Sequence, residues 1–411
     1  MHSAMPVTDN TSYYIDLEEK FGAHNYHPLP VVLNKGKGVF LWDVEDKRYY
    51  DFLSGYSAVN QGHCHPKIVE ALVEQASKLT LTSRAFHNDQ LGEYESYITA
   101  YFGYQKVLPM NTGVEAVETA IKLCRKWGYE VKGAEKNKAK IVVCSSNFHG
   151  RTLGVISYST DPSSTKNYGP FLPGFEIIEF NNTAALEQSF QDKNVVAFLF
   201  EPIQGEAGVI VPAEDYYKKV YDLCKEYNVL MVADEIQTGL CRTGKMLACD
   251  HENVRPDVLI LGKALSGGML PISAVLADDE IMLTIKPGEH GSTYGGNPLA
   301  CKIATVSLAV LKDEDLATNA EEMGQIFRKE LATINSPVIS AIRGRGLLNA
   351  IEIISKEKNM AWNICLALKE NGLLAKPTQE TKIRFAPPLV INRAQILDCV
   401  SIIRKSLESF A

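Results

Sequence analysis

The chain has 411 residues, and at roughly 100 to 200 residues per domain this length predicts two or three domains with a sizeable core. Hydrophobic residues make up 45% of the chain and charged residues 22%, values typical of globular domains, so long disordered or collagen-like segments are excluded. The net charge is −7, from 42 basic and 49 acidic side chains, and there is no basic block. We therefore expect no nucleic-acid partner.

Cysteine usage and the lack of targeting signals bear on the cellular compartment. The nine cysteines show no C-x-x-C spacing, which favours reduced thiols inside a cell. No apolar run approaches the roughly 18 residues of a membrane span. The first residues, MHSAMPVTDNTS, contain neither the apolar region of a signal peptide nor the arginines of a transit peptide. We expect a cytoplasmic protein with no membrane partner, or a mitochondrial matrix protein if a presequence has been removed.

Residues 1–60 predict a small N-terminal lobe. Residues 14–21 have helical periodicity, and residues 39–43 and 48–52 flank a turn at Glu45-Asp46, as in a β-hairpin.

From residue 61 to residue 312 amphipathic helices alternate with short apolar strands. Helices are expected at 65–80, 91–101, 114–127 and 298–311, and strands at 106–109, 141–144, 175–180, 195–200, 229–233 and 258–261. Such alternation predicts a large α/β domain with a mostly parallel sheet.

After Lys312 the composition becomes charged, and residues 313–411 predict a smaller α+β domain. Its expected strands are 347–353, 373–375 and 383–386, and its expected helices are 360–370 and 394–407.

Ligands of open α/β sheets collect at the carboxyl ends of the strands, so the residues that directly follow each predicted strand are the candidates for chemistry. Thr112, Gly113 and Val114 follow the strand at 106–109, at the start of a predicted helix. The N–H groups of a helix start suit an anion, although an ordinary Thr-Gly helix start would look the same.

Acidic and basic side chains follow three other predicted strands. Glu201 and Glu206 lie in the loop after 195–200, Asp234 and Gln237 follow 229–233, and Lys263 follows 258–261 among small residues. A desolvated lysine can act as an amine nucleophile, and a carboxylate at the end of an apolar strand needs a charged or hydrogen-bonded partner. Taken singly, Asp234 could also be a helix or turn cap, and Lys263 could be a solvated surface lysine.

Two other motifs fail on closer inspection. Residues 239–245 fit G-x-x-x-x-G-K, but Met246 stands where a phosphate-binding loop requires Ser or Thr. His63-Cys64-His65 has no second ligand pair at a matching spacing, so no metal site is expected.

Taken together, Thr112-Gly113, Asp234 with Gln237, and Lys263, which stands 263 − 234 = 29 residues after the aspartate, resemble the pyridoxal-phosphate site of fold-type-I class-III aminotransferases. Longer strings are similar to the ornithine-specific branch of that family and cover the chain nearly end to end. They include EPIQGEAGV (201–209), ADEIQTGL (233–240), GKALSGG (262–268) and KPGEHGSTYGGNPL (286–299).

The resemblance implies a role for each cofactor contact. Lys263 would hold pyridoxal phosphate as a Schiff base and carry the proton, and Asp234 would pair with the pyridinium nitrogen. Gln237 would contact the 3′-oxygen, and Phe148 and Ile236 would enclose the ring. The phosphate would be bound by Thr112, Gly113, Val114 and, from a second subunit, Thr293, which implies a homodimer with shared active sites.

The resemblance also implies substrate contacts. Tyr26 and Arg151 would hold the α-carboxylate of ornithine, and Tyr56 would shape the channel to the cofactor. Arg384 would bind the α-carboxylate of 2-oxoglutarate, and an ion pair with Glu206 would mask Arg384 while ornithine is bound.

The implied reaction is δ-transamination of L-ornithine with 2-oxoglutarate, giving glutamate and glutamate 5-semialdehyde, which cyclises to pyrroline-5-carboxylate. The alternatives are an ω-aminotransferase acting on 4-aminobutyrate or N-acetylornithine, and, more remotely, a non-catalytic binding protein of the same fold. His149 stands where related ornithine enzymes often carry an aromatic residue, which leaves its place in the pocket wall open.

Overall fold

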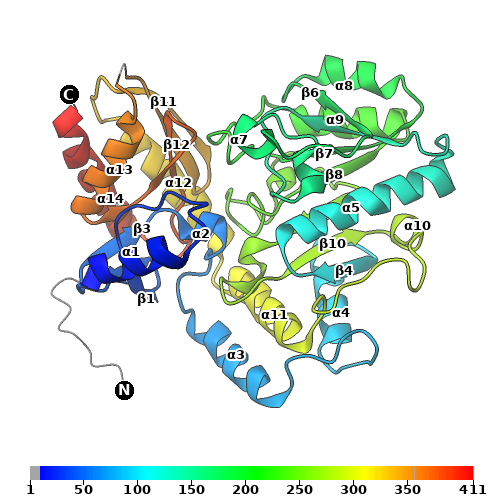
Figure 1. Ribbon diagram of the computed structural model, residues 1–411, viewed down its shortest axis with the longest axis horizontal. Helices are drawn as coiled ribbons and strands as arrows, with labels where there is room; N and C mark the ends of the chain where they lie inside the picture. Colours follow the sequence, from blue (N-terminus) through cyan, green and yellow to red (C-terminus); the bar gives the residue numbers. More distant parts are fainter. Residues whose placement is uncertain (1–9, 356, 411) are drawn as a thin grey trace.

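In the computed structural model, which describes residues 10–355 and 357–410, a seven-stranded sheet forms the centre of the larger part of the molecule (Figure 1). Every residue of its strand β7 (Val195–Phe200) is buried. A strand buried on both faces needs helices on both faces, which is typical of parallel sheets. The strands, in spatial order, are β4 (Lys106–Met110), β10 (Ser273–Ala277), β9 (Val258–Leu261), β8 (Leu230–Asp234), β7, β5 (Lys140–Cys144) and β6 (Phe175–Ile178).

Strand β10 interrupts the parallel order of this sheet, because it pairs antiparallel with both β4 and β9. The pairs from β9 through β8, β7 and β5 to β6 are all parallel. The prediction of an α/β fold with a mostly parallel sheet is confirmed, as are its six expected strands. β10 was not predicted.

Helices cover both faces of the large sheet. α5 (Gly113–Trp127) shares a core with Leu199 of β7 on one face. α8 (Thr183–Phe190) and α9 (Tyr216–Glu226) share a core with Phe198 and Phe200 on the other. The other helices of residues 54–313 are α2 (Ser54–Ser57), α3 (Pro66–Lys78), α4 (Leu91–Phe102), α6 (Leu153–Ile156), α7 (Pro162–Thr165), α10 (Asp279–Met282) and α11 (Pro298–Asp313).

Residues from both ends of the chain build the second part of the molecule, drawn in blue and in orange to red in Figure 1. β1 (Leu33–Lys37), β2 (Phe40–Asp43) and β3 (Arg48–Asp51) form an antiparallel sheet, so the predicted hairpin is confirmed. β13 (Leu373–Leu374) extends this sheet by pairing parallel with β3. The N-terminal residues therefore share a sheet with C-terminal ones.

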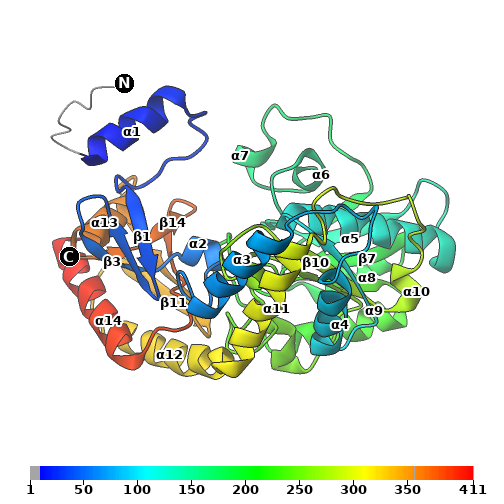
Figure 2. The ribbon, with the colours of Figure 1, turned by 90° about the horizontal axis from the view of Figure 1, so that it is seen from below.

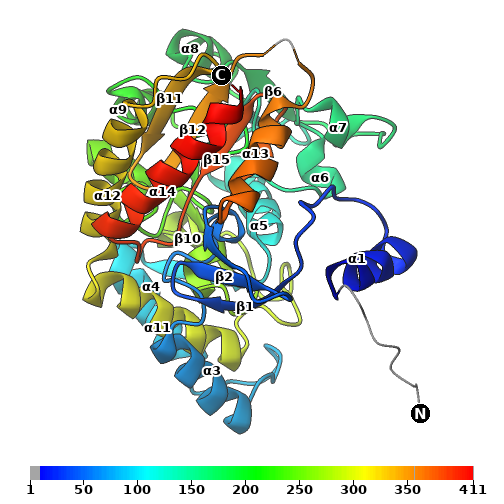
Figure 3. The same ribbon diagram turned by 90° about the vertical axis from the view of Figure 1, so that its left-hand side faces the viewer.

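A second antiparallel sheet consists of β11 (Ile339–Arg345), β12 (Leu348–Ile353), β15 (Lys382–Phe385) and β14 (Lys376–Thr378), in that spatial order. Figure 3 shows helices α12 (Leu316–Leu331), α13 (Met360–Glu370) and α14 (Arg393–Leu407) beside it. The expected strands and helices of this region are present, whereas β11, β14 and α12 were not predicted.

Helix α1 (Asn10–Phe21) lies apart from the rest of the fold. It contains no buried residue, and Figures 2 and 3 show it at the end of an extended segment, away from the sheets. The predicted helix at 14–21 is confirmed and begins four residues earlier than expected, at Asn10 (14 − 10 = 4).

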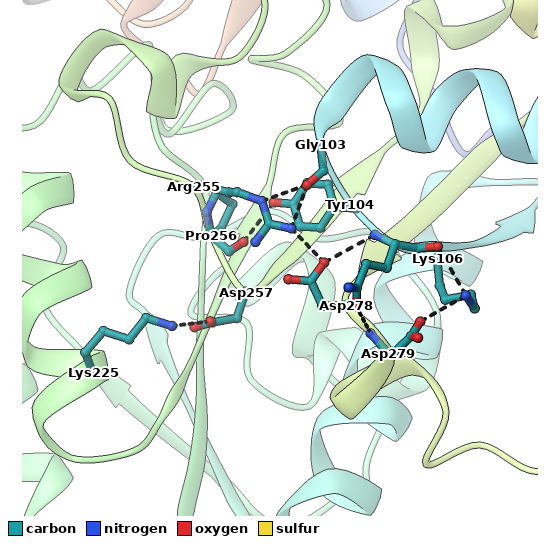
Figure 4. Close-up of polar contacts among 10 residues, drawn as sticks. Gly103, Tyr104, Lys106, Lys225, Arg255, Pro256, Asp257, Asp278 and Asp279 are labelled. Carbon is teal, nitrogen blue, oxygen red and sulfur yellow. Dashed lines mark hydrogen bonds and ion pairs between the residues drawn. The ribbon is translucent and has the colours of Figure 1, made fainter.

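A polar network joins the residues before β4 and β9 to Asp278, which directly follows the antiparallel strand β10 (Figure 4). Arg255 Nη2 donates to the carbonyl of Gly103 (2.8 Å), which caps α4, and to Asp278 Oδ1 (2.8 Å). The Arg255 guanidinium lies 3.9 Å from the ring centroid of Tyr104, whose hydroxyl donates to the carbonyl of Pro256 (2.8 Å). These contacts connect α4, β9 and β10, which gives the network a stabilising role.

No described helix has both the length and the apolar composition needed to cross a membrane. All nine cysteines carry free thiols, of which Cys64 is exposed and the others are buried. Burial raises the pKa of Cys144 to about 12, so this thiol stays protonated and unreactive at neutral pH.

Candidate active site

The loops after β4, β5, β7, β8 and β9 meet at one edge of the large sheet and enclose a cavity of about 200 Å³. Parallel strands end at the same edge, which brings these loops together. All predicted cofactor contacts except Thr112 and Thr293 line this cavity. Its wall consists of Gly113, Val114, Phe148, His149, Gly150, Glu201, Ile203, Asp234, Ile236, Gln237, Thr238 and Lys263.

Helix α5 points its N-terminus at the cavity. Thr112 caps the helix: its Oγ1 accepts from the N–H of Glu115 (3.4 Å), and Glu115 Oε2 accepts from the N–H of Thr112 (2.6 Å). Gly113 and Val114 supply the first N–H groups, which have no partner within a helix and favour an anion. A Cβ on Gly113 would come within 3.1 Å of Ile236 Cδ1, so glycine fits this approach best. Thr112 itself lines an adjoining cavity.

Asp234 and Lys263 face the cavity from neighbouring strands. Asp234 ends β8, is 5% exposed, and accepts at Oδ1 from the N–H of Ile236 (3.1 Å). The amine of Lys263 makes no hydrogen bond or ion pair with a described residue, and burial lowers its pKa. A lowered pKa increases the fraction of free amine, the form that acts as nucleophile or base. Lys263 has φ +45°, an uncommon value for a bulky residue that indicates local strain.

His149 lines the cavity and contacts Asp234. Its Nδ1 lies 2.7 Å from Asp234 Oδ2, and its buried Nε2 has no hydrogen-bond partner among the described residues. Glu201, which follows β7, accepts from the N–H of Phe148 (3.0 Å). Burial raises the pKa of Glu201 to about 8, with His149 opposing and Asp234 adding to the shift. Neither the contact of His149 with Asp234 nor that of Glu201 with Phe148 was predicted from the sequence.

Arg384 and Glu206 form a buried ion pair beside the cavity. Arg384, in β15, is 1% exposed, and its Nη1 donates to Glu206 Oε1 (2.6 Å) and to Gln237 Oε1 (3.2 Å). Gln237 Nε2 donates to the same Glu206 oxygen (3.0 Å). Burial acts to raise the pKa of Glu206, but the charge of Arg384 and these hydrogen bonds leave it lowered. Nε and Nη2 of Arg384 have no partner among the described residues.

Tyr56 lies against this ion pair, with the guanidinium carbon of Arg384 5.0 Å from its ring centroid. Its φ is +62°, a left-handed conformation that costs a residue other than glycine about 1 to 3 kcal/mol. Burial raises the pKa of Tyr56, and the charges of Glu206, Arg384 and Arg151 and the hydroxyl of Tyr26 act on it. The five predicted substrate contacts are therefore electrostatic neighbours.

Arg151 and Tyr26 are the more open members of this group. Arg151 donates to Ser164 Oγ (3.2 Å), and its guanidinium lies 5.7 Å from the ring centroid of Phe148. Tyr26 is 71% exposed and lies between α1 and β1, with Lys376 Nζ 5.9 Å from its ring centroid.

Thr293 is a predicted contact that the chain does not bring to its own cavity. It is exposed in the loop before α11 and is not among the residues that line either cavity. The adjacent Ser292 accepts at Oγ from Asn111 Nδ2 (2.8 Å), which fixes the loop beside the start of α5.

Three uncharged residues of the cavity wall, Gly150, Ile203 and Thr238, were not predicted from the sequence. Gly150 has φ +127°, and a Cβ there would meet Val114 Cγ2 at 2.5 Å, so the loop after β5 can approach α5 only through glycine. The glycine in NFHGRT was a visible signal, but Ile203 and Thr238 follow from the folded loops alone.

The donors around the cavity suit pyridoxal phosphate. The helix start offers N–H groups to a phosphate, Asp234 offers a buried carboxylate to a pyridinium nitrogen, and Lys263 offers an unpaired amine to an aldehyde. Phe148 and Ile236 supply apolar surface to the cavity wall. The described residues include no group of three or more His, Cys, Asp or Glu that could hold a metal ion.

Residues 21–407 match the aminotransferase class-III family. The mitochondrial ornithine aminotransferase of Drosophila melanogaster is 64% identical over 392 residues, 95% of this chain and 90% of that protein. The ornithine aminotransferase structure from Toxoplasma gondii has a TM-score of 0.96 at 48% identity, covering 98% of this chain and 96% of the other. The acetylornithine aminotransferase structure from Elizabethkingia anophelis has a TM-score of 0.90 at 59% identity, covering 98% and 100%. Because these similarities extend over nearly the whole chain, it belongs to the class-III aminotransferases, pyridoxal-phosphate-dependent enzymes of fold type I.

Proposed function

We propose that this enzyme transfers the δ-amino group of L-ornithine to a 2-oxo acid, preferably 2-oxoglutarate. The products are glutamate and glutamate 5-semialdehyde, which cyclises to pyrroline-5-carboxylate. The observation that carries the proposal is the similarity to ornithine aminotransferases, at 64% identity over 95% of the chain for the Drosophila protein. The ion pair of Arg384 with Glu206, which lies against the ring of Tyr56, supports it.

Bound pyridoxal phosphate supplies an electron sink for the carbon that loses a proton during amino transfer. Lys263 would hold the cofactor through its amine and then move the proton between the substrate carbon and the cofactor. Its lowered pKa suits this role, because a base works best when its pKa lies near the working pH. Such proton transfer contributes roughly 10²- to 10⁴-fold to the rate.

The other cofactor contacts would orient and charge the ring. Asp234 would keep a pyridine nitrogen protonated, and the N–H groups of Gly113 and Val114, with Thr112, would hold the phosphate. Gln237 would donate to the 3′-oxygen while keeping its bond to Glu206, because an amide nitrogen has two hydrogens.

The ion pair of Glu206 and Arg384 suits an enzyme that binds two different substrates in turn. While the pair is closed, the charge of Arg384 is neutralised, so the α-carboxylate of ornithine is directed to Arg151 and Tyr26. This orientation presents the δ-amine past Tyr56 to the cofactor. 2-Oxoglutarate is a dicarboxylate, and its α-carboxylate would displace Glu206 and bind Arg384.

The assembly we propose is a homodimer with shared active sites, in which Thr293 of one subunit contacts the phosphate bound by the other. The exposed position of Thr293 beside the start of α5 is compatible with this role. We retain the division into an N-terminal lobe (1–60), a large domain (61–312) and a small domain (313–411) as a proposal.

For the compartment we propose the cytoplasm, with the mitochondrial matrix as the alternative. The mitochondrial name of the Drosophila relative favours the alternative. Immunodetection in cell fractions decides between the two.

N-acetylornithine is the second candidate donor, because the Elizabethkingia protein that is 59% identical is named an acetylornithine aminotransferase. Steady-state kcat/KM for ornithine, N-acetylornithine and 4-aminobutyrate, each with 2-oxoglutarate, tests the proposal. We expect ornithine to exceed the other two by at least about tenfold. A higher kcat/KM for N-acetylornithine or 4-aminobutyrate would contradict the ornithine assignment.

A further inference from the structure

His149 is a buried polar residue that the proposed chemistry does not use, and it touches the residue on which that chemistry depends. Its Nδ1 lies 2.7 Å from Asp234 Oδ2, and both side chains are almost fully buried, at 0% and 5% exposure. Because an ionised carboxylate only accepts hydrogen bonds, Nδ1 carries the hydrogen and donates it to Asp234.

We propose that His149 is a positioning residue that fixes the orientation and the negative charge of Asp234, and thereby sets how tightly the enzyme holds its cofactor. This inference rests on the proposed role of Asp234 toward the pyridine nitrogen.

The hydrogen bonds of Asp234 support this role. Oδ1 accepts from the N–H of Ile236 (3.1 Å), and Oδ2 accepts from His149 (2.7 Å). The first bond belongs to the backbone turn after β8 and holds one oxygen only. The second prevents the carboxyl group from rotating about its Cβ–Cγ bond and stabilises its charged form in a buried site.

The surroundings of His149 explain how the ring is held in place. The Tyr158 ring centroid lies 5.8 Å from that of His149, and neither Tyr158 Oη nor His149 Nε2 has a hydrogen-bond partner among the described residues. Glu201, beside Phe148, is the other acidic group that acts on the imidazole. The bond to Asp234 is therefore the polar contact that determines the direction of the ring.

The contact between His149 and Asp234 does not result from neighbouring strands, because β5 and β8 are not adjacent in the sheet. β7 lies between β5 and β8, so the loop after β5 has to pass the end of β7 before His149 can reach Asp234. Gly150, with φ +127°, allows the loop to turn against Val114 directly after His149.

Two amide variants test which ring nitrogen matters. In His149→Asn the amide takes the place of Nδ1 and can still donate to Asp234, whereas in His149→Gln it takes the place of Nε2. His149→Leu removes the donor at similar volume. Tyr158→Phe removes a neighbouring hydroxyl that bonds no described residue, and serves as the control for packing around the imidazole.

The primary measurement is the dissociation constant of pyridoxal phosphate from each folded apoenzyme, by fluorescence titration. A hydrogen bond to a charged group is worth about ten- to a hundredfold in an equilibrium constant. We expect about tenfold or greater weakening in His149→Gln and His149→Leu, and a change within about threefold in His149→Asn and Tyr158→Phe. If His149→Leu does not fold, the comparison of Asn with Gln still decides.

A second measurement separates positioning from structure. We expect kcat for the ornithine half-reaction, measured at saturating cofactor, to fall in His149→Gln while KM stays within about threefold, and His149→Asn to restore it. Unchanged cofactor affinity in the Gln variant, or equal losses in Asn and Gln, would overturn the proposal. Cofactor affinity does not depend on the amine donor, so a wild-type enzyme that fails to use ornithine would refute the proposed function and leave the test of His149 intact.

Discussion

The orientation of ornithine should depend on Glu206, and Glu206→Ala tests this dependence. The substitution removes one of the two acceptors of Arg384 Nη1 (2.6 Å) and the acceptor of Gln237 Nε2 (3.0 Å), which leaves a guanidinium at 1% exposure beside the cavity without its counter-charge. An uncompensated buried cation attracts any carboxylate that reaches it. The α-carboxylate of a reversed amino acid is such a group.

The expected size of the effect follows from the lost contact. A charged hydrogen bond contributes roughly 1.5 to 3 kcal/mol, and about 1.4 kcal/mol corresponds to a factor of ten. Glu206→Ala should therefore raise the ratio of kcat/KM for glutamate, an α-amine donor, to kcat/KM for ornithine by about tenfold or more.

Single-turnover spectra of the cofactor with each donor measure this ratio without interference from the second half-reaction. Glu206→Gln serves as the matched control, because it keeps the shape and a hydrogen-bond acceptor but loses the charge, and it should give an intermediate ratio. A ratio unchanged from wild type in Glu206→Ala would refute the masking of Arg384.

Four further outcomes are expected. Lys263→Ala should retain pyridoxal phosphate through other contacts but lose essentially all turnover, and borohydride reduction with peptide mapping of the wild type should place the cofactor on Lys263 and on no other lysine. Asp234→Asn should fold and lose most activity, because a neutral amide does not hold a proton on the pyridine nitrogen; near-normal kcat would contradict this role. Thr293→Ala should weaken cofactor retention, and mixing it with Lys263→Ala should restore one intact site per hybrid dimer; full activity in an isolated monomer would rule out the shared site. Arg255→Ala should lower the free energy of unfolding in urea by about 1 to 2 kcal/mol with unchanged kcat, and Arg255→Lys should lose less, whereas a loss of kcat would place the network in the catalytic machinery instead.

The strands that are long apolar runs could be predicted from the sequence. β10 of the large sheet and β11 of the smaller antiparallel sheet could not. β7 reads VVAFLF, and each of its residues is buried, so sequence and structure agree. β10 reads SAVLA directly after Pro271-Ile272, and its place between β4 and β9 is a long-range pairing that no local pattern encodes. β11, in the smaller antiparallel sheet, includes Arg343 and Arg345 and so is not an apolar run; the strand continues through both arginines and the chain turns at Gly346.

Helix α12 was missed for a different reason. Its charged surface was interpreted as a domain boundary, although Leu316, Ala320, Met323, Phe327 and Leu331 recur at helical spacing and are all buried. The amphipathic signal was present in the sequence but was outweighed by the charge of residues 312–322.

Some features of the candidate site could likewise be predicted from the sequence and others could not. Asp234 and Lys263 were found because each directly follows an apolar strand, and the structure brings both to one cavity. The contact of His149 with Asp234 was not found, because it joins loops whose strands are not neighbours in the sheet. Local patterns identify residues at strand ends, whereas contacts between those residues depend on the order of the strands.

The origin of the transferred nitrogen tests the central claim most directly. Ornithine labelled with ¹⁵N at the δ-amine is incubated with 2-oxoglutarate and the enzyme, and both products are analysed by mass spectrometry. Transfer of the δ-amino group predicts labelled glutamate and an unlabelled cyclic product, because the ring nitrogen then comes from the α-amine. Unlabelled glutamate together with a labelled cyclic product would show transfer of the α-amine and would contradict the proposed orientation of ornithine in the site.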